Sequence, residues 1–283
     1  MTGPTPLLDF FKRGEVSRDV KLSAARGELA PRAHEQLAIL MLLVDDPDSD
    51  VRDTANGTLA TIAPDALKKF LSRSDTPAAM LDFFAKRGVT PDGAVQATDE
   101  DDDSPLIDDE RTPAAAEPGA VDAPAGGSDD EAIDPELGES KDADGKRLGA
   151  AQVLAGMNMM ERLKAAVKGT REMRAILIRD PNKMICAAVL SSPKLNDAEI
   201  ASFAKMQNVS EDVLRIIANN RAWTKSYTVI YALVKNPKTP VAQSMGFLAR
   251  LSAKDIAMLA VDRNVPEPIR VAAKKKAAAQ RLG

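Results

Sequence analysis

Few residues of this chain have the types and spacing that chemistry needs. The sequence holds one histidine, His34, and one cysteine, Cys186. A structural zinc site needs about four Cys or His ligands, and an iron–sulfur cluster needs about four thiolates, so the chain alone can build neither. A single isolated histidine also gives no basis for a Ser–His–Asp set. We therefore expect no catalytic, cofactor-binding or metal-binding residues, and we predict a protein that is not an enzyme.

The best local candidate for binding is the stretch NNRAWTKSY, residues 219–227. Trp, Tyr and Arg are enriched at binding hot spots, and Trp223 is the only tryptophan of the chain. The structural alternative is that Trp223 packs under a turn and that Tyr227 starts a helix. The candidate partner-binding residues of this stretch are Asn220, Arg221, Trp223, Lys225 and Tyr227.

Three basic residues complete the candidate set, because Arg179, Lys235 and Arg263 are separated by multiples of 28 residues. Cations at helix C-termini interact favourably with the helix dipole, which explains this placement without a ligand. Stacked helix pairs would nevertheless bring the three cations to one edge, and a positive edge attracts anions.

A repeat of 28 residues provides the frame for these positions. Stepping by 28 from Asp180 lands on Asn208, Asn236 and Asn264. Residue types that cap helices recur 16 residues after the first three, at Asn196, Thr224 and Ser252. We expect Ser210 and Thr239 to cap the other helix of the unit, with Pro240 at its first position. Helices this short cannot bury their faces alone, so neighbouring pairs must stack.

The N-terminal half carries a looser version of this pattern. Asp46 is followed by the Val51-Arg52 pair and by Ala55. The same spacing recurs near the C-terminus, at Asn264, Ile269, Arg270 and Ala273. This spacing resembles HEAT repeats, although the period is shorter than in common HEAT units. Over residues 17–88 and 150–281 the chain resembles HEAT-like repeat proteins of bacteria without assigned activity, and the resemblance implies α-solenoids that bind rather than react.

Charge divides the chain into three parts. Residues 1–98 hold 12 Lys and Arg against 14 Asp and Glu, residues 99–145 hold 2 against 18, and residues 146–283 hold 24 against 10. The acidic middle has no helical or strand periodicity and cannot bury enough apolar surface to fold. We therefore predict an all-α fold with two HEAT-like α-solenoid domains, residues 1–89 and a basic 147–283, joined by a disordered acidic linker, residues 90–146.

These features predict a non-enzymatic scaffold that mediates protein–protein interaction with an acidic partner. The alternative is nucleic-acid binding by the basic C-terminal solenoid, with the acidic linker contacting that solenoid and competing for it. A HEAT-like DNA glycosylase is a third reading, which needs Trp223 and an acidic residue in one concave site. The N-terminus has no secretory signal, and no apolar stretch is long enough for a membrane span. We expect a cytoplasmic protein.

Overall fold

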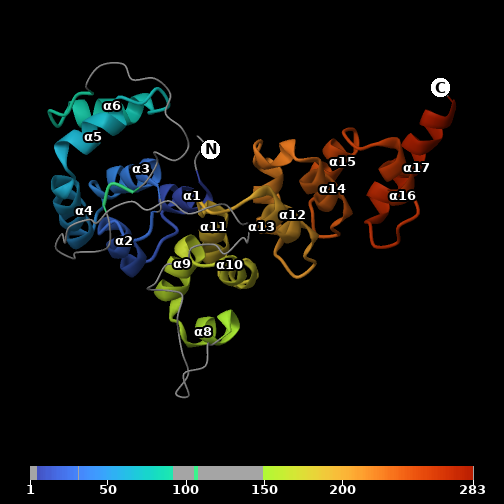
Figure 1. Ribbon diagram of the computed structural model, residues 1–283, viewed down its shortest axis with the longest axis horizontal. Coiled ribbons are helices and arrows are strands. Elements are labelled where there is room, and N and C mark those ends of the chain that lie inside the picture. Colours follow the sequence, from blue (N-terminus) through green and yellow to red (C-terminus); the bar gives the residue numbers. More distant parts are fainter. Residues whose placement is uncertain (1–4, 31, 92–104, 108–148, 283) are drawn as a thin grey trace, which may run out of the picture. The chain divides into compact units, whose positions relative to one another are not determined.

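The structure is a computed structural model that describes residues 5–30, 32–91, 105–107 and 149–282. These residues form 16 α-helices and one 3-10 helix without a strand, so the prediction of an all-α fold is confirmed for them (Figure 1). Two compact units are present, residues 2–170 and residues 171–283, called here the N-terminal and C-terminal units.

The boundary between the two units falls after Thr170, later than the predicted domain start at residue 147. Nearly all of the predicted linker, residues 90–146, lies outside the described residues. That the two halves fold independently stays a prediction. Among the helices described, none is long and apolar enough to cross a membrane.

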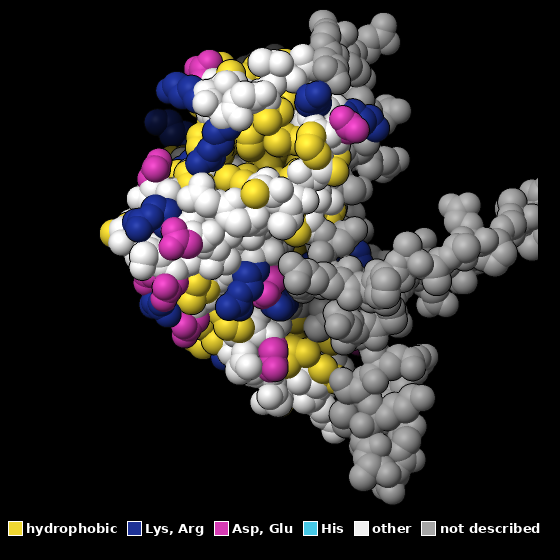
Figure 2. All heavy atoms as spheres, turned by 90° about the vertical axis from the view of Figure 1, so that its left-hand side faces the viewer, with side chains coloured by type: hydrophobic (Ala, Val, Ile, Leu, Met, Phe, Trp, Pro, Cys, Tyr) yellow, Lys and Arg dark blue, Asp and Glu magenta, His cyan; other side chains and the backbone are white. Residues whose placement is uncertain are grey.

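Eight helices of the N-terminal unit are described, and α3 contacts α1, α2, α4 and α6. They are α1 (Pro6–Arg13), α2 (Arg18–Ala25), α3 (Ala33–Leu43), α4 (Ser49–Thr61), α5 (Pro64–Leu71), α6 (Ala78–Ala85), α8 (Ala150–Gly156) and α9 (Met159–Lys168). The α3 sequence AHEQLAILMLL is apolar on nearly every side, as expected for a helix covered by neighbours all round. Figure 2 shows one face of this unit, where hydrophobic side chains gather near Lys and Arg side chains.

The C-terminal unit is a series of helix pairs. It contains α10 (Arg171–Leu177), α11 (Lys183–Ser191), α12 (Asp197–Lys205), α13 (Glu211–Asn219), the 3-10 helix η2 (Trp223–Lys225), α14 (Tyr227–Lys235), α15 (Val241–Leu248), α16 (Ala253–Leu259) and α17 (Glu267–Leu282). Alternate helices contact each other, α10 with α12, α12 with α14, α11 with α13 and α15 with α17. Successive pairs therefore pack side by side in two rows (Figure 1).

Three predicted helix caps are confirmed. The side chains of Asn196, Ser210 and Ser252 each accept a hydrogen bond from the backbone N–H three residues later, at 2.8, 3.4 and 3.2 Å. These side chains satisfy backbone donors that the first helical turn leaves unpaired.

Two predicted caps are wrong. Thr224 lies inside η2, because its hydroxyl donates to the carbonyl of Asn220 at 2.9 Å, and α14 starts only after Ser226. Thr239 is buried with a hydroxyl that has no partner among the described residues, and α15 begins at Val241, directly after Pro240. Both helices thus begin later than the 28-residue pattern predicts.

A short piece of the acidic segment is described, and it differs from the disorder expected there. Leu106 and Ile107 pack against a core cluster built from α3, α5 and α6, which includes Leu37, Phe70 and Phe84. Their backbone groups bond to a buried side chain of α3. The expectation rested on the composition of the whole segment, whereas two adjacent aliphatic side chains are enough for local docking.

Candidate binding site between successive helix pairs

The stretch KNPKTP, residues 235–240, connects α14 to α15 and is held by one buried amide. The Asn236 side chain accepts a hydrogen bond from the N–H of Lys238 at 3.0 Å, which closes the turn. Its amide nitrogen donates to the carbonyls of Ala204 and Met206, at 2.8 and 3.0 Å. Asn236 therefore ties its own turn to the C-terminal end of α12, a helix of the preceding pair.

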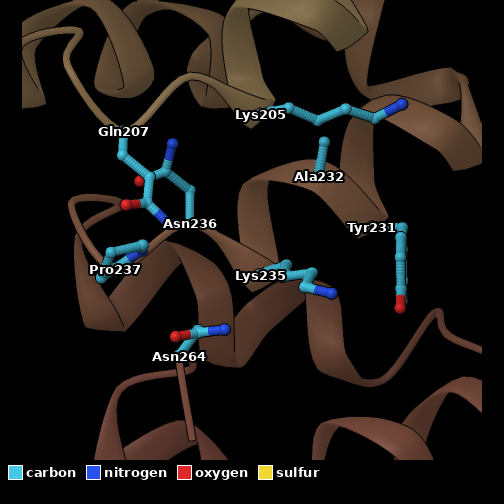
Figure 3. A pocket seen from close by; sticks show the side chains of 8 residues that line it. All are labelled: Lys205, Gln207, Tyr231, Ala232, Lys235, Asn236, Pro237 and Asn264. Atoms are coloured by element: carbon cyan, nitrogen blue, oxygen red, sulfur yellow. The ribbon is translucent and has the colours of Figure 1, made fainter. Parts of the chain in front are cut away.

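A cavity of about 300 Å³ opens beside this turn (Figure 3). It is lined by residues from the end of α12, from α14 and from the turns that follow α12, α14 and α16: Lys205, Gln207, Tyr231, Ala232, Lys235, Asn236, Pro237 and Asn264. In Figure 3 the Lys205 and Lys235 side chains lie on either side of Ala232. The cavity therefore combines an apolar surface with two ammonium groups. This combination suits an acidic ligand that also carries apolar groups.

The two lysines differ in their electrostatic surroundings. Lys235 forms an ion pair with Asp262 at 3.1 Å, and the hydrogen bond and charge of Asp262 raise the pKa of Lys235. The backbone N–H of Asn264, followed by Lys235, lowers the pKa of the Asp262 carboxyl. Lys205 is exposed and has no ion-pair partner in the described part of the chain. Lys205 is thus the cation that a ligand can reach without displacing a carboxylate.

The structure gives Trp223 and Tyr227 structural contacts. Trp223 is only 2% exposed, so its ring belongs to the core of the C-terminal unit. The Tyr227 hydroxyl donates to Asp255 and accepts from the N–H of Ser252 at 3.0 Å, which joins the starts of α14 and α16. The hydrogen bonds that the Asp255 carboxylate accepts from the hydroxyls of Tyr227 and Ser252 lower its pKa.

The other three candidate residues of this stretch lie at or near the surface. Asn220 accepts hydrogen bonds from the N–H groups of Ala222 and Trp223, at 2.9 and 3.4 Å, and so closes the turn that leads into η2. Arg221 and Lys225 are exposed. The stretch therefore contributes one core side chain, two side chains that fix helix starts and two exposed cations, rather than one continuous patch.

Of the three periodic cations, only Lys235 lines the cavity. Arg179 is exposed and donates to the carbonyl of Ala175 at 3.1 Å, within the last turn of its own helix. Arg263 is exposed in the turn before α17. The contact of Arg179 matches the structural explanation for these positions, a cation at a helix C-terminus.

Sequence reasoning named only Lys235 of the eight lining residues as a candidate and missed seven: Lys205, Gln207, Tyr231, Ala232, Asn236, Pro237 and Asn264. A usable signal existed for those that lie in turns. Gln207 precedes Lys235 by 28 residues, and Asn264 follows Asn236 by 28. For Lys205 and Tyr231 the repeat carries no such signal. A search for successive turn residues, rather than for cations alone, would have found four of the seven, Gln207, Asn236, Pro237 and Asn264.

Comparison of this chain with protein-family models, with curated proteins and with solved structures found no match. The geometry of the site is therefore the basis on which a function can be argued.

Proposed function

We propose that this protein is a non-enzymatic scaffold of HEAT-like helical repeats, arranged as α-solenoids, whose C-terminal unit binds an acidic segment of a partner protein. The observation that carries the proposal is the cavity beside the KNPKTP turn, with Lys205 and Lys235 around the apolar surface of Ala232 and Tyr231. Stacked helix pairs support the solenoid arrangement, because alternate helices contact one another along the C-terminal unit.

Exposed apolar side chains of the C-terminal unit favour a protein over a nucleic acid as the partner. Val241 and Met245 are 42% and 45% exposed and lie four residues apart, on one face of α15. Met258 and Val261 are also exposed. Nucleic-acid surfaces need cations and stacking rings more than flexible aliphatic groups. Nucleic-acid binding remains the second candidate, because residues 146–283 hold 24 basic against 10 acidic residues.

Affinity capture from a lysate of the source cells, with and without nuclease, tests the proposal. We compare the full-length protein with Lys205→Gln, which removes the unpaired cation of the cavity. The matched control is Lys194→Gln, which removes another exposed cation that does not line the cavity.

We expect a protein partner that survives nuclease treatment, is retained by Lys194→Gln and is depleted by Lys205→Gln. Loss of the captured material on nuclease treatment would instead identify nucleic acid as the ligand. Equal capture by both variants would contradict the assignment of binding to this cavity.

A further inference from the structure

The N-terminal unit contains a second arrangement that recognises peptide backbone, far from the cavity in sequence. At its centre is Gln36 of α3, whose side chain is 1% exposed. Its amide oxygen accepts hydrogen bonds from the N–H groups of Leu106 and Ile107, at 3.0 and 3.2 Å. Its amide nitrogen donates to the carbonyl of Ile107 at 3.1 Å and to that of Gly27 at 3.2 Å. Three of its four bonds therefore go to the backbone of two consecutive residues.

A buried amide needs such partners. Gln36 offers two acceptor and two donor positions, and the bonds described use all four. Without residues 106–107 the buried amide oxygen would lose both protein donors, and burial of an unpaired polar group is unfavourable. The position is thus suited to bind the backbone of a bent segment such as Leu106-Ile107, because an aliphatic side chain at residue 36 would fill the same core space without this requirement.

Gly27 makes room for the same segment. Its backbone has φ of +85°, at the C-terminal end of α2, where glycine is favoured. A Cβ atom at this position would come within 3.2 Å of the Ile107 side chain and of the Gln36 amide. Gly27 therefore serves both the helix end and the close approach of the docked segment.

The side chains of the segment add apolar contacts. Leu106 and Ile107 are partly buried and pack against the cluster formed by α3, α5 and α6. Backbone hydrogen bonds provide affinity for any segment that adopts this bend, while the apolar contacts of the two side chains favour aliphatic residues.

We propose that Gln36, Gly27 and the adjoining cluster form a groove for a bent partner segment with two adjacent branched aliphatic residues, and that Leu106-Ile107 occupies it as an internal competitor. The groove contacts only backbone groups and two aliphatic side chains. A segment with these features can therefore bind there whether it belongs to this chain or to a partner. Tethering gives the internal segment a local concentration of about millimolar. A partner therefore binds weakly until the internal segment leaves.

The test uses full-length protein and a fluorescent peptide DSPLIDDE, which has the sequence of residues 103–110. The double variant Leu106→Ala/Ile107→Ala removes the apolar contacts of the internal competitor, and so weakens its docking, and leaves the groove intact. The apparent Kd equals the intrinsic Kd divided by the open fraction. We expect peptide binding, measured by fluorescence anisotropy, to be at least about tenfold tighter in the double variant than in wild type.

Two control peptides separate recognition from nonspecific attraction without altering the protein. DSPAADDE keeps every charge but lacks the aliphatic pair. A DSPLIDDE peptide whose isoleucine is N-methylated cannot donate the hydrogen bond that Ile107 makes to Gln36. Both should bind the double variant at least about tenfold more weakly than DSPLIDDE, since each removes a contact made in the groove.

Several outcomes would overturn the proposal. One is that the double variant, checked for native helicity by circular dichroism, binds no peptide, and another is that it binds all three peptides equally. Equal binding of DSPLIDDE by wild type and double variant would exclude internal competition. A wild-type dimer in sedimentation that becomes a monomer in the double variant would assign the groove to a second copy of the chain.

Discussion

Both units contain a turn in which an Asp or Asn side chain accepts a hydrogen bond from the N–H two residues later. The remaining contacts of that side chain differ between the units. In the N-terminal unit the Asp46 carboxylate accepts from the N–H of Asp48 at 3.0 Å and pairs with the Lys21 ammonium at 2.7 Å. In the C-terminal unit the Asn236 amide accepts from the N–H of Lys238 but donates to two carbonyls of the preceding pair. A carboxylate cannot donate, so the choice of Asp or Asn decides whether the turn binds a cation or a helix end.

The ion pairs of two arginines, one from each unit, show a second contrast. Arg18 of the N-terminal unit is exposed, and it bonds to Asp48 at 2.6 Å and also to Asp50. The bond to Asp48 is the main cause of the raised pKa of Arg18. In the C-terminal unit Arg174 and Glu199 are fully buried and joined at 2.9–3.1 Å. The C-terminal unit thus has an ion pair inside its core, where a missing partner is costly, beside surface pairs such as Lys235–Asp262, whereas Arg18 forms its pairs at the surface of the N-terminal unit.

The largest expected effect follows from the buried pair. Arg174→Met leaves Glu199 as an uncompensated buried charge, so we expect a loss of about 3–5 kcal/mol in the free energy of unfolding. Trp223 is the only tryptophan and is buried in the C-terminal unit, so denaturant unfolding followed by its fluorescence reports on that unit.

Two further variants calibrate this result. The double change Arg174→Met/Glu199→Leu should recover most of the loss, because neither charge is then left alone. Arg18→Met, followed by hydrogen exchange of α2 and α4, should leave the stability of the N-terminal unit unchanged. A large loss on Arg18→Met would contradict the contrast between the two units.

The turn itself gives the next largest effect. Asn236→Asp replaces two donated hydrogen bonds by a carboxylate facing carbonyl oxygens, and we expect a loss of about 2–4 kcal/mol by Trp223 fluorescence. The reciprocal change Asp46→Asn keeps the acceptor for the N–H of Asp48 and loses only the pairing with Lys21. Hydrogen exchange of α2 and α4 should therefore show a cost nearer about 1 kcal/mol. Equal costs would show that the Asp/Asn choice is not decisive.

A third effect depends on pH. Burial raises the pKa of the Cys186 thiol to about 11, from an ordinary value of 9.0. Because the folded-state pKa is raised, the stabilisation is complete below pH 9 and is lost as the pH rises from 9 to about 11. Over this range wild type should lose about 2–3 kcal/mol more than Cys186→Ala, in which all other titrating groups remain. Parallel pH profiles would refute a buried neutral thiol.

The smallest effect tests two hydroxyls of the C-terminal unit. Ser252→Ala removes a helix cap and should cost about 0.5–2 kcal/mol. Thr239→Val keeps the shape and removes a hydroxyl that is buried without a partner, so it should be neutral or slightly stabilising. Both midpoints come from the same fluorescence measurement. A cost for Thr239→Val as large as that for Ser252→Ala would mean that the Thr239 hydroxyl has a partner in solution.

The sequence repeat predicted much of the C-terminal unit because its signals are local. A cap such as Asn196 or Ser252 acts within one helical turn, so spacing alone locates it. The start of α14 was misplaced because the 3-10 helix η2 precedes it, and Thr224, the predicted cap, lies inside η2. The cavity was predicted only at Lys235, because its other lining residues depend on how successive turns align.

Contacts between distant segments could not be predicted from one sequence. The pairing of Arg174 with Glu199 requires two particular helix faces to meet. Arg and Glu are usually exposed, so their residue types do not predict burial. The docking of Leu106-Ile107 on Gln36 was not predicted, because acidic residues dominate the composition of that segment. In both cases the contact depends on the shape of the surface against which the side chains pack.

The spacing of the links between helix pairs has a consequence for how fast the chain folds. In the C-terminal unit these links join residues 24–32 positions apart, as in Gln243 to Asn219 and Asn236 to Ala204. Proteins dominated by such local contacts fold quickly, since no long loop must close first. Gln36 and Ile107 are 71 positions apart. We therefore expect this contact to form after the helix pairs, as a late kinetic phase that Leu106→Ala/Ile107→Ala abolishes in stopped-flow refolding of the N-terminal helices.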